Sequence, residues 1–239
     1  MIRPKPTTRT RPRRPRWSSA ALAVLGVLWV AGPAASGPPR QFVYQVTHSL
    51  FGSVGTYINT IEPEGSGTLV LTQAHFDVRV LGVRMYHEVA QRTERWQGNR
   101  LIAFDGVTGN GNGPPMVVKG AARGNEFIIT SPLGTFAAPW NVHPANPWSA
   151  SFLHASEMMR VDNGKVEPVH VAGGETTTVT IGARPIPARQ YEIEGSTTYT
   201  VWLDSRGIPV KFVVDDKSGK VTFTLAKCVH CSPALVQVG

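Results

Sequence analysis

The chain has 239 residues, of which 24 are basic and 16 acidic, and a formal net charge of +8. This length suits one domain preceded by a leader. Eight of the basic residues and no acidic residue lie in 1–40, so 41–239 is formally neutral. A neutral domain lacks the overall basic surface of nucleic-acid-binding proteins, so we expect no nucleic-acid partner.

The first 36 residues have the three parts of a secretory signal peptide. Basic residues come first, then an apolar run at 20–31, then small residues that end at Ser36. This order of charge, short apolar stretch and small-residue cleavage site is typical of signal peptides. The apolar run is shorter than the roughly 20 residues of a membrane-spanning helix. We expect cleavage near Ser36 and a periplasmic or secreted protein that contacts the membrane only through its leader. An uncleaved N-terminal anchor is the alternative.

Beyond the leader, apolar and polar residues alternate with a period of two, which predicts half-buried β-strands. Strands are predicted at 42–50, 54–61, 68–80, 83–96, 100–107, 115–122, 125–131, 166–172, 175–182, 186–195, 197–204, 208–215 and 219–226. Between them, 132–149 is rich in Pro, Trp and Asn and predicts irregular structure, and 149–160 is compatible with one short helix.

Regular short strands with turn residues between them indicate an all-β domain over 37–226. We predict an antiparallel meander that forms a curved sheet, a half-barrel or a barrel, with at most one short helix. A C-terminal tail, 227–239, would follow this domain.

The two longest predicted strands, 68–80 and 83–96, are separated only by Leu81-Gly82 and predict a hairpin. Their alternation also predicts which residues face the core, because a strand exposes successive side chains on opposite faces. The inward set is Phe76, Val78, Val83, Met85 and Val89. The outward set, which would face solvent or line a polar rim, is His75, Asp77, Arg84 and Glu88, with Tyr86, Arg92 and Glu94 on the same face as Arg84. A one-residue slip in the pairing would reverse every assignment.

Short motifs spread over most of the domain resemble a known family. They are Tyr44-x-Val46, Gly52-x-Val54-Gly55, Val83-x-x-Tyr86, Glu94-x-Trp96-x-Gly98-x-x-Leu101, Gly134, Trp148, Tyr191-x-Ile193-x-Gly195, Trp202-Leu203-Asp204-x-x-Gly207-Ile208-Pro209-Val210-Lys211 and Gly219-x-Val221-x-Phe223-x-Leu225. In this order they resemble exported bacterial proteins catalogued as a domain of unknown function, DUF6134. The resemblance implies a β-rich envelope protein with a curved sheet. It implies no activity and no functional residues.

The two cysteines of the chain, Cys228 and Cys231, lie in a Cys-Val-His-Cys motif outside the family pattern. In an oxidising compartment this pair predicts a disulfide. The closed ring is small, so we expect it to add little stability. Haem attachment would need a histidine where Ser232 stands. Thiol exchange, or a metal held by Cys228, His230 and Cys231, remains an alternative, although zinc usually has four ligands.

Two other groups of residues are candidate sites. His75 and Asp77 share one strand face, and such a pair can orient an imidazole for catalysis. No recognisable nucleophile accompanies them, so a solvated strand face is the favoured interpretation. Trp140 and Trp148 flank a Pro-rich segment and could line the mouth of a ligand pocket. The favoured alternative is that both cover the edge of the sheet.

No motif identifies a catalytic residue or a cofactor, so three hypotheses for function remain. The first is a non-enzymatic domain that binds an apolar small molecule, a lipid or an envelope protein. The second is a thiol- or metal-dependent protein, and the third a structural interaction module. A large apolar cavity would favour the first, and converging polar groups with shifted pKa values the second. A filled interior with a flat exposed patch would favour the third.

Overall fold

The structure, a computed structural model, describes residues 37–111, 113–216 and 219–231. The predicted signal peptide, 1–36, and the last eight residues of the predicted tail lie outside the described residues. The described chain is all-β, as predicted, with one short 3-10 helix, η1 (Ala150–His154). None of its described helices is long and apolar enough to cross a bilayer.

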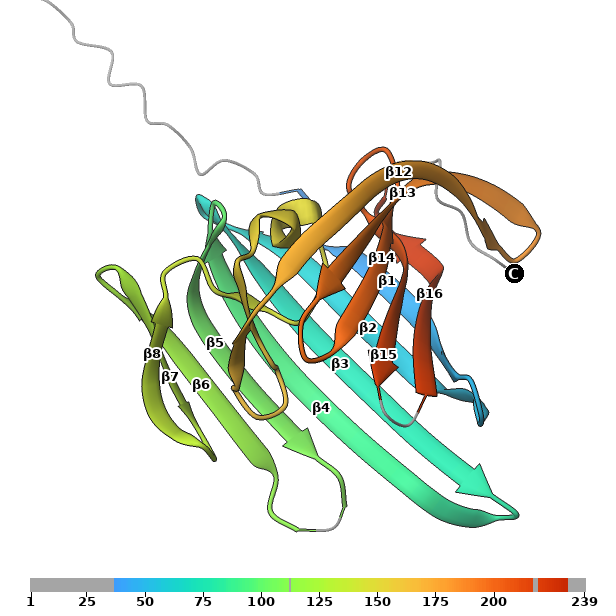
Figure 1. Ribbon diagram of the computed structural model, residues 1–239, viewed down its shortest axis with the longest axis horizontal. Helices are drawn as coiled ribbons and strands as arrows, with labels where there is room; N and C mark the ends of the chain where they lie inside the picture. Colours follow the sequence, from blue (N-terminus) through green and yellow to red (C-terminus); the bar gives the residue numbers. More distant parts are fainter. Residues whose placement is uncertain (1–36, 112, 217–218, 232–239) are drawn as a thin grey trace, which may run out of the picture. The chain divides into compact units, whose positions relative to one another are not determined.

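Most of the described strands belong to one large antiparallel sheet (Figure 1). They are β1 (Arg40–His48), β2 (Gly52–Glu64), β3 (Gly67–Val80), β4 (Val83–Gln97), β5 (Arg100–Gly109), β6 (Met116–Arg123), β7 (Glu126–Ser131), β8 (Gly134–Pro139), β12 (His170–Ile181), β13 (Arg184–Glu194), β14 (Thr198–Leu203), β15 (Pro209–Asp216) and β16 (Gly219–Val229). The spatial order is β12-β13-β14-β15-β16-β1-β2-β3-β4-β5-β6-β7-β8. Two meanders are therefore joined by the pairing of the last strand with the first.

The sheet is curved and open, with β12 and β8 as its edge strands. Each strand adds a right-handed twist, and sheets of more than about ten strands rarely stay flat. Here β12 curls back until it contacts β16 without pairing with it. The sheet thus has a concave inner face, on which the core lies. The curved-sheet prediction is confirmed.

A crossover segment between β8 and β12 lies on this inner face and is drawn in yellow in Figure 1. It contains η1 and a second small sheet of β9 (His143–Pro144), β10 (Glu157–Met159) and β11 (Val166–Pro168). The stretch 132–149, predicted to be irregular, thus contains β8 and β9. The helix predicted within 149–160 is limited to η1, because Glu157–Met159 pair with β11 instead of continuing the helix.

A β-bulge in the β3–β4 hairpin reverses part of the predicted face assignment. Leu81 and Gly82 both have positive φ and form a two-residue turn that pairs Val80 with Val83. The register then shifts, so that Val78 lies opposite Tyr86 instead of Met85. One extra residue on one strand exchanges the inner and outer faces beyond that point.

The prediction for β3 was right; on β4 it was right for Arg84, which faces outward beside Asp77, and wrong beyond the bulge. Phe76 packs against the core, and Val78 is buried. On β4, however, Val83, Met85 and Val89 are exposed. Four residues predicted to face outward face inward, namely Tyr86, Glu88, Arg92 and Glu94. Arg92 and Glu94 are buried. Alternation could not decide between the faces, because both sets contain apolar residues.

Large aromatic and aliphatic side chains from the inner face form the core. Those that are almost fully buried include Trp96, Tyr44, Phe42, Phe127, Phe152, Leu101, Ile129, Met159 and Ile193. Tyr44 also donates a hydrogen bond of 2.9 Å to the carbonyl of Pro209, which ties β1 to the start of β15. The core therefore joins the two meanders.

The last strand is longer than predicted. Strand β16 runs to Val229, three residues past the predicted end of the domain, and Cys228 pairs with Phe42 of β1. The first residues of the predicted tail are thus part of the sheet.

Candidate functional site

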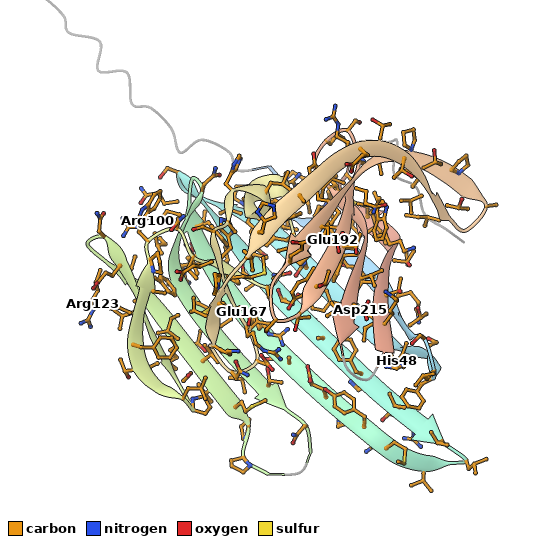
Figure 2. The ribbon with its side chains drawn as sticks, in the orientation of Figure 1. His48, Arg100, Arg123, Glu167, Glu192 and Asp215 are labelled. Carbon is orange, nitrogen blue, oxygen red and sulfur yellow. A yellow bond between two sulfur atoms is a disulfide. The ribbon has the colours of Figure 1, made fainter. Side chains whose placement is uncertain are left out.

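An apolar pocket opens at one end of the inner face, where β4 begins and β1 and β3 end. Its lining comes from six strands and the β1–β2 turn: His48, Phe51, Val54, Phe76, Val78, Tyr86, Val214, Val221 and Phe223. Figure 2 labels His48 and Asp215, which mark this end of the sheet. The volume is about 390 Å³, within the range of about 300–1,000 Å³ common for small-molecule sites.

The floor of the pocket is a packed group of aromatic rings. Phe223 stacks on Phe212 with ring centroids 4.2 Å apart, and Tyr57 meets both rings edge-on. Phe76 meets Phe223 edge-on at 6.2 Å. Stacked and edge-on pairs are the favoured arrangements of aromatic side chains. The core therefore holds this floor in place without help from a ligand.

His48 and Tyr86 bring the polar side-chain groups to the pocket lining. The His48 Nδ1 atom accepts a hydrogen bond of 3.1 Å from the backbone N–H of Leu50, and its ring lies 4.8 Å from Phe51. The Tyr86 hydroxyl donates to a carboxylate oxygen of Glu88. Burial, together with this bond, raises the pKa of Tyr86, so the hydroxyl stays protonated. The remaining lining is apolar and suits the apolar part of a ligand.

Further along the inner face, a cluster of buried polar side chains attaches the crossover segment to the sheet. At its centre, Asn146 Nδ2 donates to Glu94 Oε1 at 2.7 Å and to Thr72 Oγ1 at 3.1 Å. Its Oδ1 atom accepts from the Tyr57 hydroxyl at 2.8 Å and from Asn59 Nδ2 at 3.0 Å. One asparagine thus bonds to partners on β2, β3 and β4, and all five side chains are buried.

Glu94 is the charged member of this cluster. Its Oε2 atom accepts hydrogen bonds from the indole N–H groups of Trp96 at 2.9 Å and Trp148 at 3.1 Å. Burial raises the pKa of Glu94 to about 7, although these bonds and the one from Asn146 act in the opposite direction. A carboxyl group with such a pKa can serve in catalysis. Because protein donors occupy both oxygens and the side chain is inaccessible, we assign Glu94 a structural role.

The two candidate tryptophans have different surroundings, and neither lines the apolar pocket. Trp148 is half-buried, bonds to Glu94 and lies 5.8 Å from the Trp96 ring. Trp140 is 48% exposed. His143, from the same segment, packs 5.0 Å from Trp96, and burial lowers its pKa to about 4. The segment thus contributes to the polar cluster, and its two tryptophans lie outside the lining of the apolar pocket.

His75 and Asp77 lie on the outer face of β3, away from both sites. Asp77 forms ion pairs of 2.8 Å with Arg79 and Arg84, and the hydrogen bond from Arg79 lowers the pKa of its carboxyl. The imidazole that contacts the Asp77 carboxylate is that of His87 on β4, whose Nδ1 atom lies 3.5 Å from Oδ2. Asp77 is therefore paired with arginines at the surface and does not orient His75.

Cys228 and Cys231 form a disulfide in the structure, with Cα atoms 5.7 Å apart. Both side chains pack against the edge of the core. His230 Nδ1 contacts the carbonyl of Pro39 at 2.8 Å. Two sulfurs bonded to each other leave no thiolate to join His230 as a metal ligand. Within the part of the chain that the structure describes, no group of three or more potential metal ligands occurs.

Sequence reasoning missed both Asn146 and the pocket. One signal for the polar cluster was available, since Glu94 alternates with Trp96 on a single strand face. An acidic residue in step with a large apolar one suggests a buried, hydrogen-bonded carboxylate. Placing Glu94 on the outer face hid this signal. Nothing in the sequence indicated that Asn146 is its partner.

Comparisons with known proteins agree with this fold. A crystal structure titled as a beta-barrel-like protein of domain of unknown function DUF1849 from Brucella abortus is similar, with a TM-score of 0.60. The alignment covers 80% of this chain and 97% of that chain at 10% identity, a level that shows a shared fold alone. No curated protein matches the chain. A family model described as a domain of unknown function, DUF6134, matches residues 45–226. The match spans most of the chain and confirms the motif resemblance, so the protein belongs to the DUF6134 family.

Proposed function

We propose that this protein is an exported, non-enzymatic domain that binds an apolar ligand in the pocket between β1–β4 and β15–β16. The observation that carries the proposal is the pocket itself, whose lining is apolar except at His48 and Tyr86. Ligand pockets combine a mostly apolar lining with a few polar groups that orient the ligand. The two polar residues of this pocket would meet the polar end of an amphiphilic ligand.

The size of the pocket limits the ligand. A volume of about 390 Å³ is near the lower end of the range for drug-sized ligands. One hydrocarbon chain or a small ring compound therefore fits this space better than a complete two-chain lipid. The aromatic floor adds flat apolar surface, which suits either shape.

The ligand can be sought by native mass spectrometry, with lipid extraction, of protein purified from its host's own envelope. Binding to the pocket can be tested with the fluorescent apolar probe N-phenyl-1-naphthylamine. Val214 lines the pocket from β15, so Val214→Trp should fill it and weaken probe binding about tenfold or more, as steric loss of an apolar site does.

The matched control is Val107→Trp, on β5, because Val107 is 40% exposed and remote from the pocket lining. This variant should bind the probe as the unchanged protein does. Equal probe binding by both variants would show that the pocket is not the binding site. Urea unfolding of each variant establishes that the compared proteins are folded.

A further inference from the structure

The β3–β4 hairpin extends beyond the strands on either side of it. The last β3 residue that pairs with β2 is Phe76, and the first β4 residue that pairs with β5 is Val89. Residues 77–88 therefore pair only with each other and project from the sheet, at the lower right of Figure 1. Such a free hairpin is normally protected by charged side chains, because exposed apolar strands aggregate.

Besides its charged residues, this hairpin carries exposed apolar side chains, and the neighbouring β1–β2 turn carries more. We call the whole set the apolar rim: Leu50 (73% exposed), Phe51 (45%), Val80 (40%), Leu81 (100%), Val83 (62%), Met85 (65%) and Tyr86 (45%). Single exposed apolar residues need no explanation, but a contiguous group indicates a binding surface.

The apolar rim is continuous with the pocket. Phe51 and Tyr86 belong to both, since each is 45% exposed and each also lines the pocket. An apolar molecule could thus pass from the rim into the pocket along these two side chains. Tyr86 also has the form that favours a membrane interface, with an apolar ring and a polar end.

On the outer face of this hairpin the charged side chains favour cations, whereas Glu88 lies on the inner face near Arg92. Arg79 and Arg84 share the single carboxylate of Asp77, each at 2.8 Å, and both arginines are more than half exposed. Exposed ion pairs of this kind are weak and exchange partners readily. Arginines beside inserted apolar side chains attract the phosphates of anionic lipids.

We propose that the apolar rim docks on the surface of a bilayer that contains anionic lipid, with Leu81, Val83 and Met85 inserted among the acyl chains. The rim lies at the end of a hairpin that projects beyond the pairing with β2 and β5, so its apolar side chains can enter a bilayer without burying the rest of the sheet. Docking there would place the pocket mouth at the membrane. The docking itself does not depend on the proposed function; only its purpose, to bring a ligand to the pocket, rests on that function.

The test is flotation with vesicles of three parts phosphatidylethanolamine to one part phosphatidylglycerol, compared with vesicles of phosphatidylcholine alone. The protein is used as purified from its host, so all variants share the same N-terminus and any contribution from it cancels. The triple variant Leu81→Ser, Val83→Ser, Met85→Ser removes the inserted apolar groups. Its partition coefficient to the anionic vesicles should therefore fall about tenfold or more.

The control variant is Val107→Ser, Val117→Ser, which changes exposed valines on the outer faces of β5 and β6. It should partition as the unchanged protein does. Arg79→Gln with Arg84→Gln should reduce binding to anionic vesicles and leave the weak binding to phosphatidylcholine unaltered. Equal partitioning of the triple variant and the control would overturn the proposal. So would a concentration-dependent dimer that the triple variant abolishes, since a second copy would then cover the rim.

Failure of this proposal is distinguishable from failure of the proposed function. The triple variant keeps the pocket lining and should bind N-phenyl-1-naphthylamine normally in solution. Val214→Trp keeps the rim and should float with anionic vesicles normally. Loss of probe binding with retained flotation, or the reverse, thus identifies which site is affected.

Discussion

Replacing Asn146 by alanine tests whether the buried polar cluster holds the crossover segment on the sheet. The change removes hydrogen bonds to Glu94, Thr72, Tyr57 and Asn59, at 2.7 to 3.1 Å. A neutral hydrogen bond contributes about 1 kcal/mol net, and one to a charged group about 1.5–3 kcal/mol. The hydroxyls of Tyr57 and Thr72 can rotate toward other partners, which offsets part of the loss. We expect Asn146→Ala to lower the free energy of unfolding by about 3–5 kcal/mol.

The assay is urea unfolding followed by tryptophan fluorescence, because Trp96 and Trp148 bond to the same carboxylate. A lower midpoint with an unchanged slope would report lost stability without a change in the unfolded state. Amide hydrogen exchange adds a local measurement. It should show faster exchange at 143–159 than in the β1–β5 ladder, if the segment opens before the sheet unfolds.

The matched control is Asn141→Ala, five residues earlier in the same segment. Asn141 donates one exposed hydrogen bond, of 3.3 Å, to Ser156, so its loss should cost less than about 0.5 kcal/mol. If the two variants differ by less than about 1 kcal/mol, the cluster does not anchor the segment. The cavity left at Asn146 would then be filled by water that replaces the lost bonds.

Two further predictions concern pH and the disulfide. The pKa of Glu94 is raised from 4.5 to about 7 by burial, so the folded state binds the proton more tightly than the unfolded state. Glu94 therefore favours folding at acidic pH, and stability should fall by about 2–3 kcal/mol as the pH rises through this window, from about 5 to about 8. Glu94→Gln should flatten that dependence in urea titrations, and a dependence that persists would assign it to another group. Replacing Cys228 and Cys231 together by serine should lower stability by less than about 1.5 kcal/mol in thermal unfolding, since their short ring constrains the unfolded chain little. A larger loss would show that the disulfide secures the β1–β16 junction.

The strand order along the chain could be predicted from the sequence, and the reason is local. A strand with one buried face needs an apolar residue at every second position, as at Phe42, Tyr44 and Val46. Gly between such stretches supplies the positive φ that tight turns require, as at Gly65 and Gly98. These signals lie within a few residues of one another, so they can be recognised without knowing which strand is the partner. They predict an antiparallel β domain and the approximate limits of its strands.

The faces of β4 and the sites were decided by tertiary structure. A single bulge opposite Val78 shifts the β3–β4 pairing, and both faces of β4 are apolar enough to be buried, so the alternation alone was ambiguous. Asn146 meets Glu94 across 52 residues of sequence, and no local pattern records that contact. The pocket likewise forms only when β1–β4 and β15–β16 are joined by the β1–β16 pairing. Alternation fixes which residues a strand can bury, whereas register and strand order determine which buried residues meet.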